Sequence, residues 1–206
     1  RSCHVSPQAV MSTHDVPNIY HVPLMLQEQG LCEILGVDHR ATDLLSDWKT
    51  MAHHLDTLTE AVHIAMVGKY TDLSDAYLSV IKSLQHAAMA VDRKLVIDWI
   101  EASHLESDWS NDAEKTTAWD LLKNADGVLV PGGFGDRGVE GKIAAANYAR
   151  TTNTPYLGIC LGLQVATIEF CRNVLNLEGA NSTEFNENAP TAAVVFMPEI
   201  SKTHLG

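Results

Sequence analysis

Residues 158–164 read Gly-Ile-Cys-Leu-Gly-Leu-Gln, and this stretch decides the expected fold. The apolar run Pro155–Ile159 predicts a strand, and residues 161–175 predict a helix that begins at once. Cys160 therefore stands between a strand and a helix, in the arrangement of a nucleophile elbow. The dipole and the free N–H groups at a helix start favour a thiolate over a thiol. A buried structural cysteine at a tight turn stays open as an alternative.

The same alternation of strand and helix continues on both sides of the elbow. Apolar patterns predict strands at residues 63–67, 94–100, 127–130 and 192–196, and helices at 74–91, 112–124 and 139–150. Such alternation predicts βαβ units, with helices on both faces of a parallel sheet. Ligand chemistry is then expected at the carboxyl ends of the strands. Before residue 61, we expect two helices, over 22–36 and 42–60.

A second glycine-rich turn, Pro131–Gly135, follows the expected strand at 127–130. In a parallel sheet this turn can lie beside the elbow, where its N–H groups and that of Leu161 could form an oxyanion hole. Residues 133–138 also fit the GxGxxG pattern, but a dinucleotide site needs an acidic residue about 20 positions later, and that region has none. The turn does not fit a P-loop either.

Two further polar features are open to more than one interpretation. Downstream of the elbow helix, the string Asn181–Phe185 favours a solvated loop on pattern alone. The alternative is that Glu184 holds the α-amino group of an amino-acid substrate. His53 and His54 are adjacent on an expected helix, where neighbouring side chains point in different directions, so we expect no metal site there.

The composition is that of a globular protein, with 46% hydrophobic and 19% charged residues among 206. The formal net charge of −12 argues against nucleic acid and anionic membrane as main partners. No apolar run has the length of a membrane span, and residues 1–10 lack the apolar stretch of a signal peptide. The four cysteines form no CxxC pair, which favours free thiols and a cytoplasmic location.

The elbow and the glycine-rich turn together resemble the class I glutamine amidotransferases, and longer strings resemble the CTP synthase family. These strings are Met66–Thr71, Asp75–Tyr77, Val130–Lys142 and Ala180–Phe185, with Cys3–Val5, His14–Tyr20 and Val22–Leu24 upstream. The resemblance implies a flavodoxin-like amidotransferase domain over 61–206, truncated at its C-terminal edge. It also implies the end of a synthetase (amidoligase) domain over 1–40 and an interdomain linker helix over 41–60.

The resemblance implies roles for individual residues as well. Cys160 would attack the side-chain amide of glutamine and form a glutamyl thioester, while the backbone N–H groups of Gly133 and Leu161 hold the oxyanion. Arg137 matches an arginine near the region linked to activation by GTP. Four residues match family positions around bound glutamine: Gly132, Phe134, Gln164 and Glu184.

For the longer protein, the resemblance implies CTP formation from UTP, ATP and L-glutamine in a cytoplasmic homotetramer. Ammonia released at Cys160 would pass to the synthetase domain, which would bind ATP and Mg²⁺, and GTP would be the activator. We expect no cofactor and no metal on residues 1–206 themselves.

The thioester chemistry also needs a base and an acid. The resemblance places the family's histidine and its orienting glutamate beyond residue 206, so we expect this segment alone to be inactive. His204 is the only histidine after Cys160, and an exposed loop position is its simpler interpretation. Two other functions stay open: a different cysteine hydrolase or amidotransferase, and a catalytically inactive interaction or regulatory module.

Overall fold

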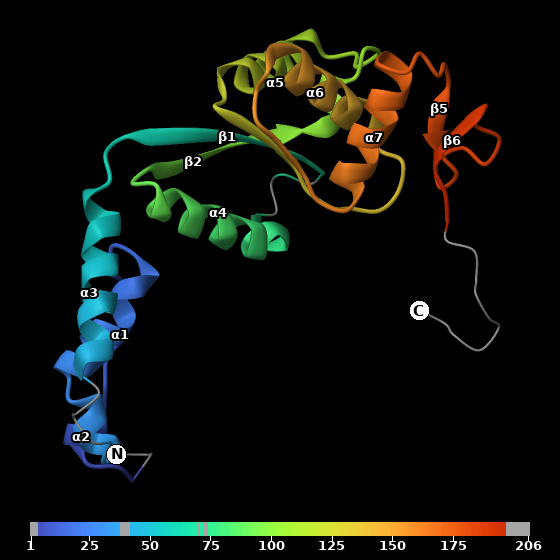
Figure 1. Cartoon of the computed structure of the whole chain (residues 1–206). Helices are drawn as coiled ribbons and strands as arrows, with labels where there is room; N and C mark the ends of the chain where they lie inside the picture. The colour runs from blue at the N-terminus through green and yellow to red at the C-terminus, as the bar shows by residue number, and fades with distance from the viewer. Residues whose placement is uncertain (1–3, 38–41, 70, 72–73, 197–206) are drawn as a thin grey trace, which may run out of the picture. The chain divides into compact units, whose positions relative to one another are not determined.

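The computed structural model describes residues 4–37, 42–69, 71 and 74–196, so that Cys3 and His204 lie outside the described residues. The chain divides into two compact units. The first consists of residues 1–60 with 87–94, and the second of residues 61–86 with 95–206. Figure 1 labels the helices of both units and the strands other than β3 and β4.

The first unit is helical. It contains α1 (Val22–Glu28), α2 (Leu31–Leu35) and α3 (Thr42–Thr57), with short 3-10 turns at Pro7–Ala9 and Ile19–His21. The prediction of one helix over 22–36 is wrong, because Gly30 takes a left-handed φ of +83° and separates α1 from α2. A left-handed residue cannot continue a right-handed helix, and glycine adopts this conformation without a steric cost.

A small apolar cluster holds the first unit together. Tyr20, Leu24 and Ala52 are buried, and Trp48 packs against them. The indole Nε1 of Trp48 donates a hydrogen bond of 2.6 Å to the carbonyl oxygen of Tyr20. The indole thus satisfies its polar atom while its ring covers the cluster.

The second unit alternates strands and helices as predicted. Its strands are β1 (Ala61–Gly68), β2 (Lys94–Glu101), β3 (Gly127–Val130), β4 (Tyr156–Gly158), β5 (Ala180–Ser182) and β6 (Thr191–Val194). Its helices are α4 (Leu78–Ala90), of which residues 87–90 are counted with the first unit, α5 (Asp112–Asn124), α6 (Val139–Thr152) and α7 (Leu161–Asn173), with 3-10 turns η4 (Ser74–Tyr77) and η5 (Ala102–Leu105). The strand β5 and the turn η5 were not predicted.

The main sheet has the strand order β2-β1-β3-β4. The pairs β1–β3 and β3–β4 are parallel, with Ala65 opposite Val128 and Val130 opposite Gly158. This is the order of the first four strands in a flavodoxin-like sheet. Figure 1 shows α4 on one face of the sheet and α5 and α6 on the other. The predicted α/β fold with a parallel sheet is therefore confirmed.

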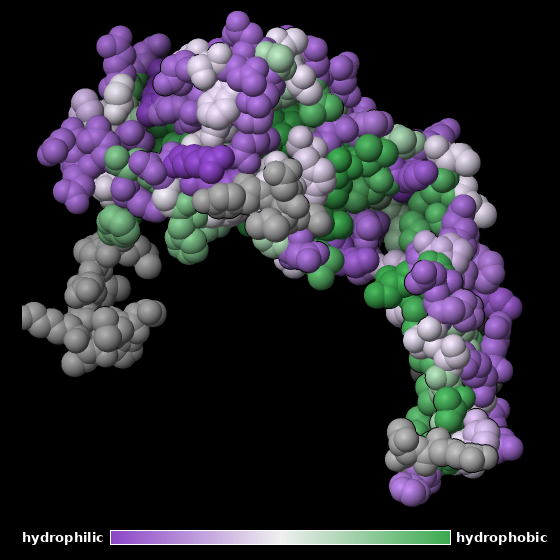
Figure 2. All heavy atoms as spheres, turned by 180° about the vertical axis from the view of Figure 1, so that it is seen from behind, coloured by the Kyte–Doolittle hydropathy of each residue, from purple (hydrophilic) through white to green (hydrophobic). Residues whose placement is uncertain are grey.

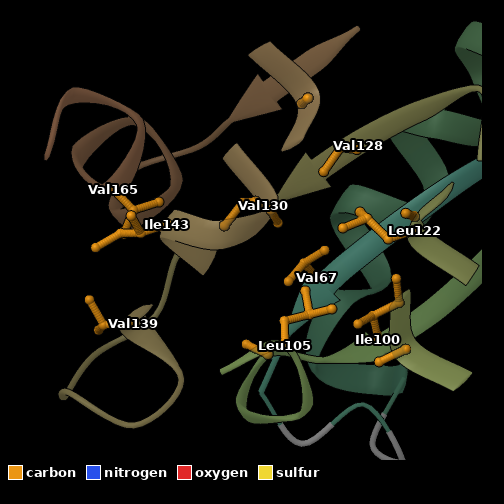
Figure 3. Close-up of a cluster of buried hydrophobic side chains, with 14 of the residues drawn as sticks. Val67, Ile100, Leu105, Leu122, Val128, Val130, Val139, Ile143 and Val165 are labelled. Carbon is orange, nitrogen blue, oxygen red and sulfur yellow. The ribbon is translucent and has the colours of Figure 1, made fainter. Parts of the chain in front are cut away.

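The core of the second unit lies between the sheet and its helices. All four residues of β3 are buried, which explains its uninterrupted apolar sequence, since a central parallel strand is covered on both faces. Figure 3 labels nine of the packed side chains that it draws: Val67, Ile100, Leu105, Leu122, Val128, Val130, Val139, Ile143 and Val165.

An ion pair between the exposed Arg150 and the buried Glu169 joins α6 to α7. The guanidinium of Arg150 donates three hydrogen bonds of 2.8–3.1 Å to the two carboxylate oxygens of Glu169, and Asn173 donates a fourth of 3.1 Å. Glu169 is 2% exposed, so its charge depends on these donors. The contacts fix α7 against α6, and with it the start of α7.

The surface is mainly hydrophilic, in keeping with the net charge, and Figure 2 shows this on the face it presents. Apolar side chains are nevertheless exposed around β4 and along α7, at Leu157, Ile159, Leu163 and Phe170. In the part of the chain that is described, no helix is both long enough and apolar enough to cross a membrane.

Candidate active site

Cys160 lies between β4 and α7 in a backbone conformation that L-residues rarely adopt, with φ 54° and ψ −108°. The residue is exposed and forms the N-cap of α7. Its carbonyl oxygen accepts hydrogen bonds from the N–H groups of Leu163 (3.0 Å) and Gln164 (3.2 Å), which begin the helix. Such a strained residue costs about 1–3 kcal/mol and occurs where a side chain must be presented for chemistry.

Two glycines make this sharp turn possible. A Cβ added at Gly162 would lie 2.0 Å from the carbonyl oxygen of Val130, and one at Gly158 would lie 2.5 Å from the carbonyl of Gly162. Both contacts are far inside van der Waals distance and involve backbone atoms. Only glycine therefore lets α7 begin so close to the ends of β3 and β4.

The side chain of Tyr156 fixes the first turn of α7. Its hydroxyl donates a hydrogen bond of 2.7 Å to the carbonyl oxygen of Gly162. Burial raises the pKa of Tyr156 far above its usual value, and the nearby Glu169 carboxylate raises this pKa further. The phenol consequently stays protonated and remains a donor at all physiological pH values.

The glycine-rich turn lies directly against Cys160. A Cβ added at Gly132 would be 3.3 Å from the Cβ of Cys160 and 3.9 Å from its sulfur. One added at Gly133 would be 4.0 Å from Cδ2 of Leu161. No acceptor in the described part of the chain engages the N–H of Gly133 or of Leu161. The structure thus brings two free donors to the neighbourhood of the thiol.

The other predicted site residues occupy different positions. Gln164 lies half-buried in the first turn of α7, whereas Phe134 is 93% exposed at the tip of the turn. Glu184 is exposed just after β5, and its N–H donates to the hydroxyl of Ser182 at 3.2 Å. Arg137 lies just before α6.

Arg137 forms an ion pair with Glu101, with 3.2 Å between nitrogen and oxygen.

The structure gathers one group of predicted residues at the ends of β3 and β4: Gly132, Gly133, Cys160, Leu161 and Gln164. Glu184 and Arg137 lie outside this group, on the loops after β5 and before α6. Among the residues described, no group of three or more His, Cys, Asp or Glu could hold a metal ion.

Two lysines that were not predicted as site residues lie beneath the glycine-rich turn. Lys69, at the end of β1, donates from Nζ to the carbonyl oxygens of Phe134 (2.9 Å) and Gly135 (3.0 Å). Lys142 is 1% exposed in the first turn of α6, and its Nζ lies 3.9 Å from a Cβ added at Gly133. The sequence did contain a signal for Lys142, since it is a charged residue within the apolar stretch Gly141–Ala146. A lysine in such a stretch of a helix points toward the core.

Burial lowers the pKa of Lys142 from 10.5 to about 8. The ammonium of Lys69 lowers this pKa further, while the carboxylate of Glu101 opposes the shift. The desolvated charge opposes folding, since the folded state holds the proton less tightly than the unfolded chain.

Replacing Lys142 by methionine is expected to raise the free energy of unfolding near pH 7 by about 1–3 kcal/mol, since one pKa unit corresponds to ~1.36 kcal/mol. The penalty from the lysine is complete below pH 8 and fades as the pH rises toward 10.5, so the gain should shrink over that range. Urea unfolding near pH 7 and near pH 10 measures the difference. Lys123→Met, an exposed site on α5, is the control. An equal gain at both pH values would contradict the prediction.

Known proteins match this chain over most of its length. The family model "Glutamine amidotransferase class-I" matches residues 72–196. The chain is 51% identical to the CTP synthase of Dictyostelium discoideum and 48% identical to that of Schizosaccharomyces pombe, in each case over 99% of its length. It spans only 39% and 36% of these two relatives.

A solved structure gives the same result. It is the glutaminase domain of Trypanosoma brucei CTPS with bound acivicin, which superposes with a TM-score of 0.60 and 43% sequence identity. The match covers 66% of this chain and 50% of that one. Cys160 and the turn Pro131–Gly135 both fall inside the region matched by the family model. With homology to CTP synthases along nearly its whole length, the chain belongs to the class I glutamine amidotransferase family.

Proposed function

We propose that this chain is the glutamine-hydrolysing part of a CTP synthase and that Cys160 is its nucleophile. The observation that carries the proposal is the strained, exposed Cys160 at the start of α7, with the turn containing Gly132 and Gly133 against it. A thiol at a helix N-terminus is the arrangement that favours a reactive thiolate. The two adjacent free N–H groups are of the kind that stabilise a tetrahedral oxyanion.

In the proposed reaction, the sulfur of Cys160 attacks the side-chain amide carbon of glutamine. The carbonyl oxygen becomes an oxyanion that accepts hydrogen bonds from the N–H groups of Gly133 and Leu161. The C–N bond then breaks, ammonia leaves with an added proton, and a glutamyl thioester remains. Water attacks the thioester, releases glutamate and restores the thiol. A histidine oriented by a glutamate, outside the described residues, is proposed to carry the protons.

Substrate binding is proposed to involve four residues around the thiol: Gly132, Phe134, Gln164 and Glu184. The exposed carboxylate of Glu184 is free to accept the α-amino group of glutamine, which needs a negative partner. Gly132 leaves open space beside the sulfur, because any side chain there would approach it. The acivicin bound to the Trypanosoma brucei domain supports this role, since acivicin is a glutamine analogue.

For the longer protein, we propose that the ammonia passes to a synthetase domain that uses ATP and Mg²⁺ to aminate UTP. Residues 1–40 would be the end of that domain, residues 41–60 the linker helix and residues 61–206 the amidotransferase domain. Arg137 is proposed to lie near the site at which GTP activates the enzyme. We further propose a cytoplasmic homotetramer. The relatives named CTP synthase support these assignments, because they match 99% of this chain.

Labelling with the glutamine analogue 6-diazo-5-oxo-norleucine tests the nucleophile. The full-length protein is incubated with the analogue and digested, and the peptides are examined by mass spectrometry. We expect a single adduct on Cys160, absent from Cys160→Ala and retained in Cys171→Ala, which removes a cysteine from the same helix. Labelling that survives Cys160→Ala, or no labelling of the wild-type protein, would overturn the proposed function.

A further inference from the structure

The side chain of Lys69 holds the turn Pro131–Gly135 by its main chain. Its ammonium donates to the carbonyl oxygens of Phe134 at 2.9 Å and Gly135 at 3.0 Å. Lys69 is only 9% exposed, so water competes little for these bonds. Hydrogen bonds from a charged donor are roughly twice as strong as neutral ones. Lys69 thus fixes the orientation of two consecutive peptide planes.

The turn has few other means of holding its shape. The side chain of Phe134 is 93% exposed and contributes almost no packing, and Gly135 has a φ of +77° and no side chain. At its upstream end the turn continues from β3, and Gly132 lies against Cys160. Its downstream end is attached to the sheet by the bonds from Lys69 and, two residues later, by the ion pair of Arg137 with Glu101. The bonds from Lys69 are the ones that act on the peptide planes next to Gly133, so their loss would loosen the direction of its N–H relative to the thiol.

Lys69 is itself held in place by two aromatic residues. The hydroxyl of Tyr77 donates to the carbonyl oxygen of Lys69 at 2.6 Å and accepts from its N–H at 3.2 Å. The ring of Tyr77 packs on Trp99 of β2, with 5.6 Å between ring centroids. Gly68 permits this approach, because a Cβ there would lie 3.0 Å from the Tyr77 hydroxyl. The contacts form a continuous path from β2 to the glycine-rich turn.

We infer that Lys69 is a positioning residue for glutamine hydrolysis: it orients the turn Pro131–Gly135 so that the N–H of Gly133 faces the oxyanion formed at Cys160. The inference rests on the proposed function. Lys69 acts through backbone carbonyls and does not touch the substrate. Its effect therefore belongs to the transition state, where the oxyanion exists, and not to the binding of glutamine.

Kinetics of the full-length protein test the inference. Lys69→Met keeps the length of the side chain and removes the donor. We expect the kcat for glutamine hydrolysis to fall about 10- to 100-fold with KM changed less than about threefold, as for a misplaced oxyanion donor. The rate of alkylation of Cys160 by iodoacetamide, which forms no oxyanion, should stay unchanged. Lys123→Met is the matched control.

A second variant tests whether a lower kcat in Lys69→Met could come from a general loss of folding. Tyr77→Phe keeps the charge of Lys69 and the aromatic packing on Trp99, but removes the hydroxyl that holds the Lys69 backbone. It should lower kcat in the same direction by a few-fold. An unchanged kcat in Lys69→Met, a rise in KM alone, or a parallel loss of iodoacetamide reactivity would each overturn the inference.

Limited proteolysis separates this inference from the proposed function, because it needs no enzymatic activity. Phe134 is 93% exposed, so chymotrypsin can reach the bond after it. In Lys69→Met, cleavage after Phe134 should be about tenfold faster than in the wild-type protein, while cleavage within α5 is unaffected. Equal cleavage rates in the two proteins overturn the inference. A wild-type protein that does not hydrolyse glutamine overturns the proposed function instead, whatever the cleavage rates show.

Discussion

Replacement of Cys160 by alanine will lower the glutaminase kcat of the full-length protein by about 10⁴-fold or more. Loss of the nucleophile in a covalent mechanism leaves only the contribution of the oxyanion hole and of substrate binding. The other described thiols cannot take over the role, since Cys171 lies eleven positions later within α7 (171 − 160 = 11) and Cys32 lies in the first unit. The ammonia released from glutamine over time measures the effect.

Supplying ammonia directly, in place of glutamine, distinguishes the loss of the nucleophile from the loss of the folded structure. In Cys160→Ala, CTP formation from UTP and ATP should fail with glutamine and persist with an ammonium salt, because free ammonia replaces the missing product. Cys171→Ala should retain both activities. If Cys160→Ala loses both, the variant is misfolded and the glutamine result says nothing specific about the nucleophile. If it keeps glutamine-dependent activity, the nucleophile lies elsewhere.

Substitution of alanine for Gly162 is expected to lower the free energy of unfolding by about 3 kcal/mol or more. The added Cβ would lie 2.0 Å from the oxygen and 2.9 Å from the carbon of the Val130 carbonyl. Val130 is fully buried in the central strand β3, so neither backbone can yield without disturbing the core. The start of α7 must shift, and Cys160 shifts with it.

The same variant should therefore react poorly with 6-diazo-5-oxo-norleucine, with a labelling rate reduced about 100-fold or more, as for a displaced catalytic group. Urea unfolding and mass spectrometry measure the two effects. Thr167→Ala, at an exposed position of the same helix, is the matched control and should behave like the wild-type protein. Wild-type stability and labelling in Gly162→Ala would show that the close contact with β3 does not govern the elbow.

Most elements of the second unit could be predicted because their apolar residues follow a clear period. The bounds of α5 and of β3 agree with the expectation, since Asn111 caps α5 and the apolar run of β3 ends at Pro131. The strand β5 was missed because Ala180–Ser182 is short and lacks the β-branched and aromatic residues that mark strands. The helix expected over 22–36 failed because one left-handed glycine outweighs a continuous apolar pattern.

The candidate site was predictable to the extent that local sequence controls it. The elbow around Cys160 and the turn at Pro131 follow from small residues at strand ends, and strand order then brings them together. Lys69 and Lys142 could not be found in this way. A lysine in a sequence predicts an exposed side chain. These two lysines are buried because β1 and α6 pack beneath the turn, and this packing depends on contacts between residues distant in sequence.

The positive φ of Cys160 has a consequence for the directed evolution of this protein. A glycine at position 160 would adopt the same backbone conformation without strain. The relief of about 1–3 kcal/mol of strain exceeds the entropic cost of glycine, about 0.5–1 kcal/mol, so the substitution is expected to make the molecule more resistant to heat. Selection that rewards heat resistance alone would favour the loss of the thiol. The strained backbone at this residue is retained only while selection also requires catalytic turnover. Position 160 is therefore a site at which thermal stability and activity favour different residues.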